Sequence, residues 1–349
     1  MIQQKSDIFV GGCMRTGTTL LQLLISQSSD TIKFIGEVDH FFWLVHAYYM
    51  GYQAIDNEFK YVFGGNFKKL ENYHRDLCKN YFQQIRQELN SEQRLVLKGP
   101  WFTRYFPLIN NLVDNVKFIT IVRHPKDTIA SLIKVGEKQA EKGFYNTYPR
   151  NQLISIIKNF LSIYEPLLKS DNNYYQNNLF IRYEDLVDFP EDTINLINNF
   201  LGTDIDYAQC STETDLGLVK LEKIQQNAYF SNLWGKGINQ SNRNKYENFF
   251  STEELAVISQ ECSNFLERFN YCLPINDTQT KQVLRNPNKQ KIYTQSLDKN
   301  NNYYPSFNTL LFFQQPREFY RQILFSQNEV FCSPDCETKT QDNGIIENI

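Results

Sequence analysis

The sequence predicts an α/β protein, with a parallel sheet of about five strands flanked by helices. Short apolar runs bounded by turn residues recur along the chain, and amphipathic helical patterns separate them. The first of these runs leads directly into a glycine-containing loop and then into a helix. Strands that alternate with helices pair in parallel and are covered on both faces.

The first strand, loop and helix are expected within residues 8–28. Ile8–Val10 is apolar and ends at Gly11 and Gly12, a pattern typical of a buried strand that leads into a tight turn. From Thr18 to Ser28 the apolar residues recur at helical spacing, at Leu20, Leu21, Leu24 and Ile25. The predicted order is therefore strand, loop, helix.

Further apolar runs predict the remaining strands: Ile32–Ile35, Leu95–Leu97, Val116–Val122 and Leu179–Ile181. Helical patterns lie between them, including Tyr73–Leu89 and Leu153–Leu168. This alternation favours a doubly covered parallel sheet over an antiparallel one.

Helix signals continue near the end of this body. Pro190 opens a helix that runs to Leu201, where Gly202 stops it. Ser251 is followed three residues later by Glu254, the spacing of a capping box, ahead of a helix that ends near Phe269.

Two regions are predicted from the change in composition. Residues 1–273 would form the folded domain, and residues 274–349 a C-terminal extension rich in Asn and Gln. Such polar composition with poor periodicity is typical of loosely ordered chain.

Charge and composition exclude several function classes. The 36 Lys and Arg nearly balance the 39 Asp and Glu, giving a formal net charge of −3, whereas a general nucleic-acid binder needs a basic surplus. The 7 cysteines are scattered and never spaced C-x-x-C, which favours a reducing compartment and no structural zinc. His40 and His46 are not spaced as a one-face helical pair, so no metal site is predicted.

No apolar run reaches the roughly 18 residues typical of a membrane-spanning helix. The first expected strand begins near Asp7, which leaves Met1–Ser6 too short for a secretory signal. A cytoplasmic protein without a membrane span is therefore expected.

The loop Gly12–Thr19 has the two glycines of a phosphate-binding loop, between a strand and a helix. Backbone N–H groups and the helix dipole converge on an anion there. A nucleotide triphosphatase has lysine directly after the second glycine, but here Thr18 follows Gly17 and the cation is Arg15. No aspartate is placed at a later strand end to hold Mg²⁺, so ATP hydrolysis is not expected.

Arg15-Thr16-Gly17-Thr18-Thr19 resembles the 5′-phosphosulfate loop of the sulfotransferases that use 3′-phosphoadenosine 5′-phosphosulfate (PAPS). The segment 121–131 is similar to that family's 3′-phosphate segment, with Arg123 at a strand end and Ser131 on the next helix. The segment 181–186, which includes Tyr183, is similar to the family's later strand-to-helix junction.

The resemblance spans residues 8 to 271 and implies a sheet like that of P-loop nucleotide-binding proteins. It also implies that PAPS is the sulfuryl donor, that a hydroxyl group is the acceptor and that no metal is needed. Sulfuryl transfer builds charge on the leaving phosphate, so positioned cations supply most of the catalysis.

Residue roles follow from the resemblance. Arg15 would stabilise the leaving oxygen, while Thr16, Gly17, Thr18 and Thr19 would bind the 5′-phosphate. Arg123 and Ser131 would share the 3′-phosphate, and Tyr183 would contact the donor nucleotide. Cytosolic members of the family have an Arg-Lys-Gly run near the C-terminal end that wraps the 3′-phosphate, whereas this chain has Gly235-Lys236-Gly237 and the segment 239–246. Arg243 is the candidate for the phosphate contact; these residues could instead be ordinary loop charges.

The general base is where this sequence departs from cytosolic members of the family. Those members have a histidine two places after a strand-end lysine, and here Pro100 follows Lys98 at that spacing. The tyrosine-sulfating branch, which also has arginine in its first loop, takes its base from a glutamate after the second strand. Glu37 fits that arrangement and His40 is a weaker candidate; Glu37 could instead cap a helix or pair with a lysine.

Three hypotheses about function therefore stay open. The first is a sulfotransferase with Glu37, Arg15 and Lys98 as catalytic residues. The second is a nucleotide or small-molecule kinase on a related loop architecture. The third is a nucleotide-binding relative that has lost transfer activity.

Overall fold

The computed structural model describes residues 5–32, 37–53, 60–210, 238, 240, 241, 243, 244, 246 and 248–271. All of them belong to one compact unit, residues 1–306. The predicted extension, residues 274–349, lies outside the described residues, so the proposed domain boundary stays a prediction.

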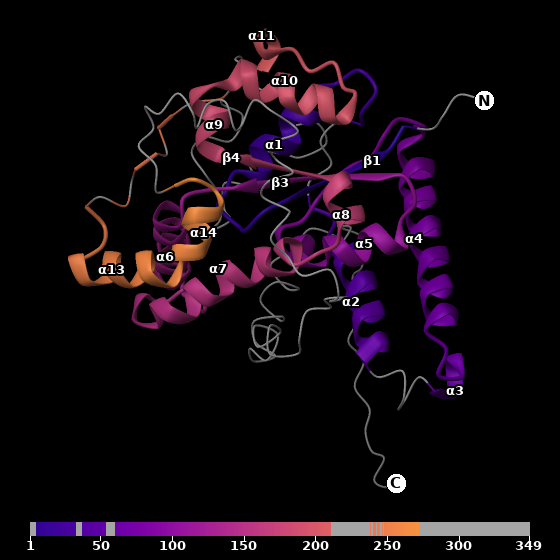
Figure 1. The fold of residues 1–349 in the computed structure, drawn as a ribbon, viewed down its shortest axis with the longest axis horizontal. Helices are drawn as coiled ribbons and strands as arrows, with labels where there is room; N and C mark the ends of the chain where they lie inside the picture. Colours follow the sequence, from indigo (N-terminus) through magenta and orange to yellow (C-terminus); the bar gives the residue numbers. More distant parts are fainter. Residues whose placement is uncertain are drawn as a thin grey trace, which may run out of the picture. The chain divides into compact units, whose positions relative to one another are not determined.

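A four-stranded parallel sheet forms the centre of the described part of the chain (Figure 1). Its strands, in the spatial order β2-β1-β3-β4, are β1 (Asp7–Gly11), β2 (Val96–Lys98), β3 (Val116–Val122) and β4 (Asn178–Arg182). The predicted α/β class is confirmed.

The fifth strand predicted at Ile32–Ile35 falls largely on residues 33–36, outside the described part. Parallel bridges lie on both sides of it, Thr31 to Arg94 and Glu37 to Lys98. These bridges bring the chain beside β2 at both ends of the predicted strand.

Helices and short helical turns connect the described strands or follow the last of them. They are α1 (Thr18–Ile25), α2 (Asp39–Gln53), α3 (Lys60–Phe63), α4 (Phe67–Leu89), η1 (Pro100–Tyr105), α5 (Phe106–Leu112), α6 (Pro125–Glu141), η2 (Arg150–Gln152), α7 (Leu153–Leu168), α8 (Asn172–Asn177), α9 (Tyr183–Asp188), α10 (Pro190–Leu201), α11 (Tyr207–Cys210), α13 (Thr252–Glu261) and α14 (Ser263–Arg268).

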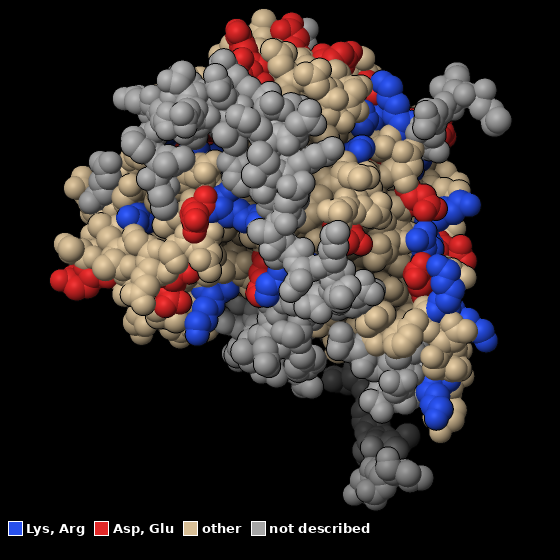
Figure 2. Space-filling model, viewed as in Figure 1, with Lys and Arg blue, Asp and Glu red and all other residues tan. Residues whose placement is uncertain are grey.

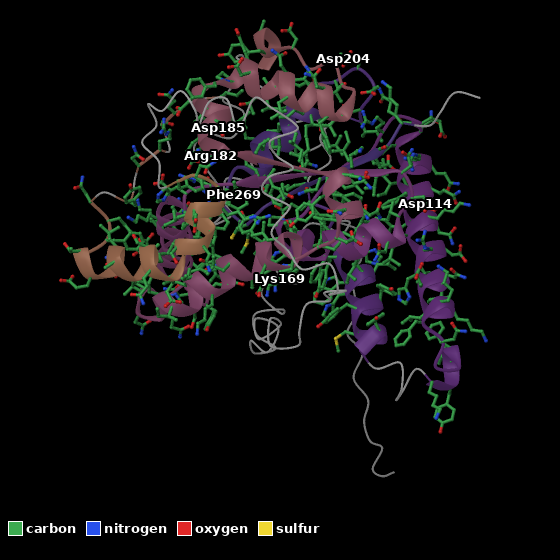
Figure 3. All side chains as sticks on the ribbon, in the orientation of Figure 1. Asp114, Lys169, Arg182, Asp185, Asp204 and Phe269 are labelled. Atoms are coloured by element: carbon green, nitrogen blue, oxygen red, sulfur yellow. The ribbon has the colours of Figure 1, made fainter. Side chains whose placement is uncertain are left out.

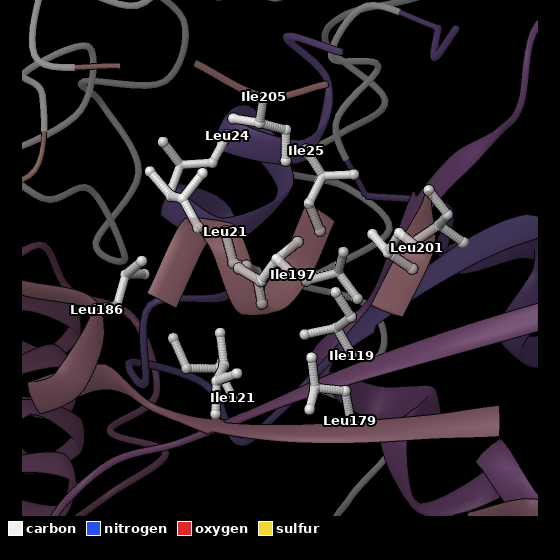
Figure 4. Packing of buried hydrophobic residues seen from close by; sticks show 14 of the residues in the cluster. Leu21, Leu24, Ile25, Ile119, Ile121, Leu179, Leu186, Ile197, Leu201 and Ile205 are labelled. Carbon is white, nitrogen blue, oxygen red and sulfur yellow. The ribbon is translucent and has the colours of Figure 1, made fainter. Parts of the chain in front are cut away.

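Side chains alternate along β1, so each face of the sheet packs against different helices. Ile8 and Val10 join a hydrophobic cluster with residues of α1, α9 and α10, among them Leu21 and Ile197 (Figure 4). Phe9 points to the other face, where it contacts aromatic rings of α2, α4, η1, α5 and β3: Phe41, Phe82, Phe102, Phe106 and Phe118. Burial on both faces explains the uninterrupted apolar run that predicted this strand.

Local signals placed several helices correctly. The helix ranges predicted at Leu153–Leu168 and Pro190–Leu201 are those of α7 and α10, and Gly202 ends α10 with a φ of 66°. The capping box of Ser251 and Glu254 is present in full. The single helix expected after it is instead two, α13 and α14, with Cys262 between them.

The helix predicted at Tyr73–Leu89 begins earlier, at Phe67. Asn66 caps it, because its side chain accepts hydrogen bonds from the N–H groups of Lys68 and Lys69. On α4 basic and acidic side chains are interspersed, as Figure 2 shows, with Glu71 paired to both Lys68 and Arg75.

The strand register brings the carboxyl ends of the strands to one edge. Gly11 pairs with Thr120, and Val122 pairs with Arg182, so the first loop and the ends of β3 and β4 follow one another along that edge. Val10 pairs with Lys98, the last residue of β2. Ligands of open α/β sheets bind at this edge.

Candidate active site

The first loop, residues 12–17, joins β1 to α1 in a conformation that requires its glycines. Gly12 and Gly17 have φ values of 143° and 103°, which favour glycine. A Cβ at Gly12 would lie 2.4 Å from the carbonyl oxygen of Ile121, and one at Gly17 would lie 2.8 Å from the ring of Tyr183. Arg15 also has a positive φ, 70°, so a strained residue carries the loop's one cation.

Side-chain hydroxyls from outside the first loop hold its beginning. The N–H of Gly12 donates to Thr103 Oγ1 at 2.9 Å, and the N–H of Cys13 donates to the Tyr164 hydroxyl at 2.8 Å. Within the loop, Thr16 Oγ1 donates to the carbonyl oxygen of Cys13 at 2.6 Å. Sequence patterns did not reveal Thr103 or Tyr164, because both are far from the loop along the chain.

Thr18 and Thr19 begin α1, with Gly17 as the N-cap and no side-chain cap. The first turn of an α-helix leaves N–H groups without intrahelical partners, and the helix dipole adds positive potential there. This is the backbone arrangement on which the predicted anion site depends, and the binding itself stays a prediction. Burial raises the pKa of Cys13 to about 12, so its thiol stays protonated and is no nucleophile.

The two segments that the sequence assigned to phosphate binding are in contact. Arg15 Nε donates to Ser131 Oγ on α6 at 3.1 Å, and Arg123 Nη1 donates to the carbonyl oxygen of Arg15 at 2.9 Å. The guanidinium of Arg123 lies 4.8 Å from the ring centroid of Tyr183, a cation–π contact. Four predicted site residues thus meet at the carboxyl edge of β1, β3 and β4.

Arg123 is 6% exposed and faces a buried carboxylate. Asp127, on the first turn of α6, places Oδ2 3.9 Å from Arg123 Nη2. The same oxygen accepts the N–H of Asn244 at 3.0 Å. Asp127 therefore links the strand-end arginine to the segment that contains Arg243.

Arg243 itself is bonded through Nη1 to both carboxylate oxygens of Asp188, at the end of α9. Its charge also acts on Tyr183, whose pKa is raised by burial and lowered in part by Arg123 and Arg243. The predicted residue therefore lies near the site, with its guanidinium held by Asp188. The neighbouring residues 235–237, 239 and 245 lie outside the described part.

Lys98 and Glu37 form an ion pair at the other side of the edge. Lys98 Nζ lies 2.5 Å from Glu37 Oε1 and donates to Thr19 Oγ1 at 3.2 Å. The N–H of Val38 donates to the carbonyl oxygen of Lys98 at 3.1 Å, which fixes Glu37 beside the strand end. The Lys98 side chain is 2% exposed and that of Glu37 is 42% exposed, so the carboxylate can be reached from solvent. Pairing with a lysine, one alternative the sequence left open, is what the structure shows for Glu37.

His124 was not predicted as a site residue, although it lies between Arg123 and Pro125. Its Nδ1 accepts the N–H of Lys126 at 3.2 Å, and its ring stacks on Tyr246 with centroids 5.4 Å apart. Burial, together with the charges of Lys126, Arg182 and Arg123, lowers its pKa to about 4, so the ring is neutral near neutral pH. His124 therefore joins Tyr246 to the end of β3 without adding charge.

Next to His124, several polar side chains are buried at the junction of β4 and α9. Glu184 accepts the N–H of His124 at 3.0 Å and the hydroxyl of Tyr271 at 2.9 Å. Arg182 and Asp185 lie at the same junction (Figure 3), and burial raises the pKa of Asp185 to about 6. This group anchors the last described residue of the chain to the site.

The other histidines are engaged separately. The ring of His40 stacks on Tyr81, and His46 Nδ1 is within hydrogen-bond distance, 2.9 Å, of the Tyr105 hydroxyl. In the described part of the chain there is no group of three or more metal-ligating side chains. No described helix is both long and apolar enough to cross a membrane.

The described part of the chain is thus a parallel α/β protein whose sheet gathers arginines, a lysine, a serine and a helix N-terminus at its carboxyl edge, where ligands of such sheets bind. A profile of the Sulfotransferase family matches residues 7–207. The chain belongs to the sulfotransferase family.

Among known proteins, one of Caenorhabditis briggsae, provisionally named a protein-tyrosine sulfotransferase, is 27% identical over 203 residues. That match covers 58% of this chain and 66% of the relative, just under two thirds of the relative's length.

Solved sulfotransferase structures also match, at low identity. The sulfotransferase domain from the curacin biosynthetic pathway matches with a TM-score of 0.46 and 18% identity, over 74% of this chain and 98% of that domain. The sulfotransferase domain of the Synechococcus PCC 7002 olefin synthase matches with a TM-score of 0.49 and 17% identity, over 78% of this chain and 98% of that domain.

Proposed function

We propose that this chain transfers the sulfuryl group of PAPS to a hydroxyl acceptor by in-line displacement, without a metal ion. The observation that carries the proposal is the contact between the two predicted phosphate segments, in which Arg15 reaches Ser131 and Arg123 reaches the carbonyl oxygen of Arg15. PAPS carries its 5′-phosphosulfate and 3′-phosphate on one ribose, so the two anion sites must adjoin.

Each residue has a role that follows from its position. The helix N-terminus at Gly17, Thr18 and Thr19 binds the 5′-phosphate, while Thr16 braces the loop through its bond to Cys13. Arg123 and Ser131 bind the 3′-phosphate, and the ring of Tyr183 supports Arg123 through the cation–π contact. Arg243 adds positive potential beside Tyr183.

Arg15 and Lys98 stabilise the charge that develops on the leaving oxygen and on the oxygens in transfer. Glu37 accepts the proton of the acceptor hydroxyl, and the acceptor oxygen then forms the new bond to sulfur as the bond to the phosphate oxygen breaks. The exposed Glu37 carboxylate and the buried Lys98 ammonium lie on the side of the site where an acceptor can approach. His40, exposed at the start of α2, is the weaker alternative base.

The chemical class of the acceptor can be identified by a direct assay. The name of the C. briggsae relative points to tyrosyl hydroxyls. A panel of tyrosyl peptides, phenols, alcohols and carbohydrates, each tested with PAPS, would identify the acceptor class.

Calorimetry with adenosine 3′,5′-bisphosphate (PAP) tests the donor site. We expect binding without any divalent metal, and sharply weaker binding of adenosine 5′-phosphate, because each lost charge-assisted hydrogen bond is worth about 1.5–3 kcal/mol. Equal binding of the two nucleotides would contradict the assignment of Arg123 and Ser131. Binding of ATP that depends on Mg²⁺ would favour a kinase instead.

A further inference from the structure

We propose that Thr103 and Tyr164 are positioning residues of the donor site: their hydroxyls hold the first loop in the shape that binds the donor phosphates. The inference rests on the proposed function, because it concerns the same site. Neither residue lies in a segment proposed to bind phosphate, and neither has a proposed contact with the donor.

The two hydroxyls engage successive N–H groups at the start of the loop. Thr103, on η1, accepts the N–H of Gly12, and Tyr164, on α7, accepts the N–H of Cys13. Thr103 is 0% exposed, as is Tyr164, so water cannot replace either bond. These two N–H groups are therefore committed to the protein, and the phosphate must be bound by the later part of the loop.

Tyr164 also joins the loop to β3. Its hydroxyl donates to the carbonyl oxygen of Ile121 at 3.2 Å, two residues before Arg123. One hydroxyl thus bridges Cys13, at the start of the first loop, and the strand that presents Arg123. The bridge fixes the spacing between the two proposed phosphate sites from a helix that contributes no phosphate ligand.

The conformation of the loop explains why such support is needed. Gly12 passes close to Ile121, and Arg15 has a left-handed backbone conformation that a loop without support would leave. Burial raises the pKa of Tyr164 well above its ordinary value, so the hydroxyl keeps the proton that it donates to Ile121.

The ring of Tyr164 has a separate, structural role. It packs against Phe160 of α7 and Phe265 of α14, with ring centroids 5.4 Å and 5.2 Å away. Tyr164→Phe keeps this packing and removes only the hydroxyl. Tyr174→Phe is the matched control, because Tyr174 is a buried tyrosine of α8 whose ring packs on Phe118 and Tyr175.

The experiment measures PAP affinity by calorimetry and donor kinetics for both variants. We expect Tyr164→Phe to weaken PAP binding about tenfold, because the buried N–H of Cys13 loses its acceptor. The donor KM should rise while the acceptor KM stays within about twofold, and Tyr174→Phe should change neither. Thr103→Val, which removes the other hydroxyl at nearly constant shape, should act in the same direction.

A second measurement does not depend on any ligand. In the ligand-free full chain, amide hydrogen exchange of the segment 8–20 should accelerate in Tyr164→Phe and Thr103→Val, and stay unchanged in Tyr174→Phe. Unchanged exchange, or PAP affinity equal in Tyr164→Phe and Tyr174→Phe, would overturn the positioning role. A wild-type chain that does not bind PAP refutes the proposed function, while the exchange experiment still decides the role of the two hydroxyls.

Discussion

His124 should make the stability of this protein decrease in mild acid. Its pKa is lowered from 6.5 to about 4 by burial and by the charges of Lys126, Arg182 and Arg123. Between those two values the unfolded chain binds more protons than the folded one, so stability rises with pH and falls as the pH is lowered. The stabilising contribution is therefore complete above about pH 6.5 and is lost progressively toward pH 4.

The magnitude follows from the same shift. At about pH 5 the histidine is protonated in the unfolded chain but not in the folded one. This lowers the free energy of unfolding by about 2 kcal/mol relative to pH 7 or above. Asp185 acts in the opposite direction, because burial raises its pKa to about 6 and the folded state then holds the extra proton. Asp185 and the other titrating groups are present in both wild type and a His124 variant. The difference between the two proteins therefore isolates the contribution of His124.

His124→Asn is the suitable variant, since asparagine can still cap α6 by accepting the N–H of Lys126 but does not titrate in this range. Urea unfolding at pH 7 and at about pH 5 should show that the variant loses about 2 kcal/mol less than wild type on acidification. The same loss in both proteins would refute the reasoning. Loss of Tyr246 stacking should lower the variant's stability equally at both pH values.

Three other predictions concern the site and its boundary. Arg15→Ala should reduce turnover far more than PAP affinity, because the charge that Arg15 faces grows in the transition state; equal losses would mean that it only anchors the nucleotide. Glu37→Gln should keep PAP affinity and lose roughly 10²-fold or more in turnover on a verified acceptor, and near-normal turnover would assign the base elsewhere, with His40→Ala measured next. A chain truncated after Tyr271 should stay folded and bind PAP, as followed by thermal unfolding and calorimetry, and aggregation would show that the extension completes the core.

Local patterns predicted the parts of the fold that depend on neighbours in sequence. Pro190 and Gly202 mark the ends of α10, and the glycines of the first loop mark the turn from β1 to α1, because each reflects a backbone requirement of its own position. The start of α4 was missed although Asn66 carries an N-cap signal there.

The residues that sequence reasoning could not find act across the fold. Thr103 is 91 residues from its partner Gly12, and Tyr164 is 151 residues from Cys13. A threonine in a helical turn and a tyrosine in an amphipathic helix carry no pattern that distinguishes them from ordinary core residues. Only the packing of η1 and α7 against the first loop reveals their contacts.

Carboxylates of the chain itself accompany most of the cations at the site. Lys98 pairs with Glu37, Arg123 faces Asp127, and Arg243 is bonded to Asp188. This arrangement limits the cost of burying Lys98 and Arg123 before a ligand arrives, since an unpaired charge in the interior is strongly unfavourable.

The same pairing has a consequence for binding. In the proposed function, an incoming dianion gains less from Arg123 than it would from an unaccompanied cation, because Asp127 already offsets part of that charge. More of the binding energy must then come from oriented donors, namely the N–H groups at the start of α1 and the hydroxyl of Ser131. Oriented donors act only when the loop holds its shape, so the proposed role of Thr103 and Tyr164 predicts that affinity for the dianion falls when either hydroxyl is removed, even with every cation in place.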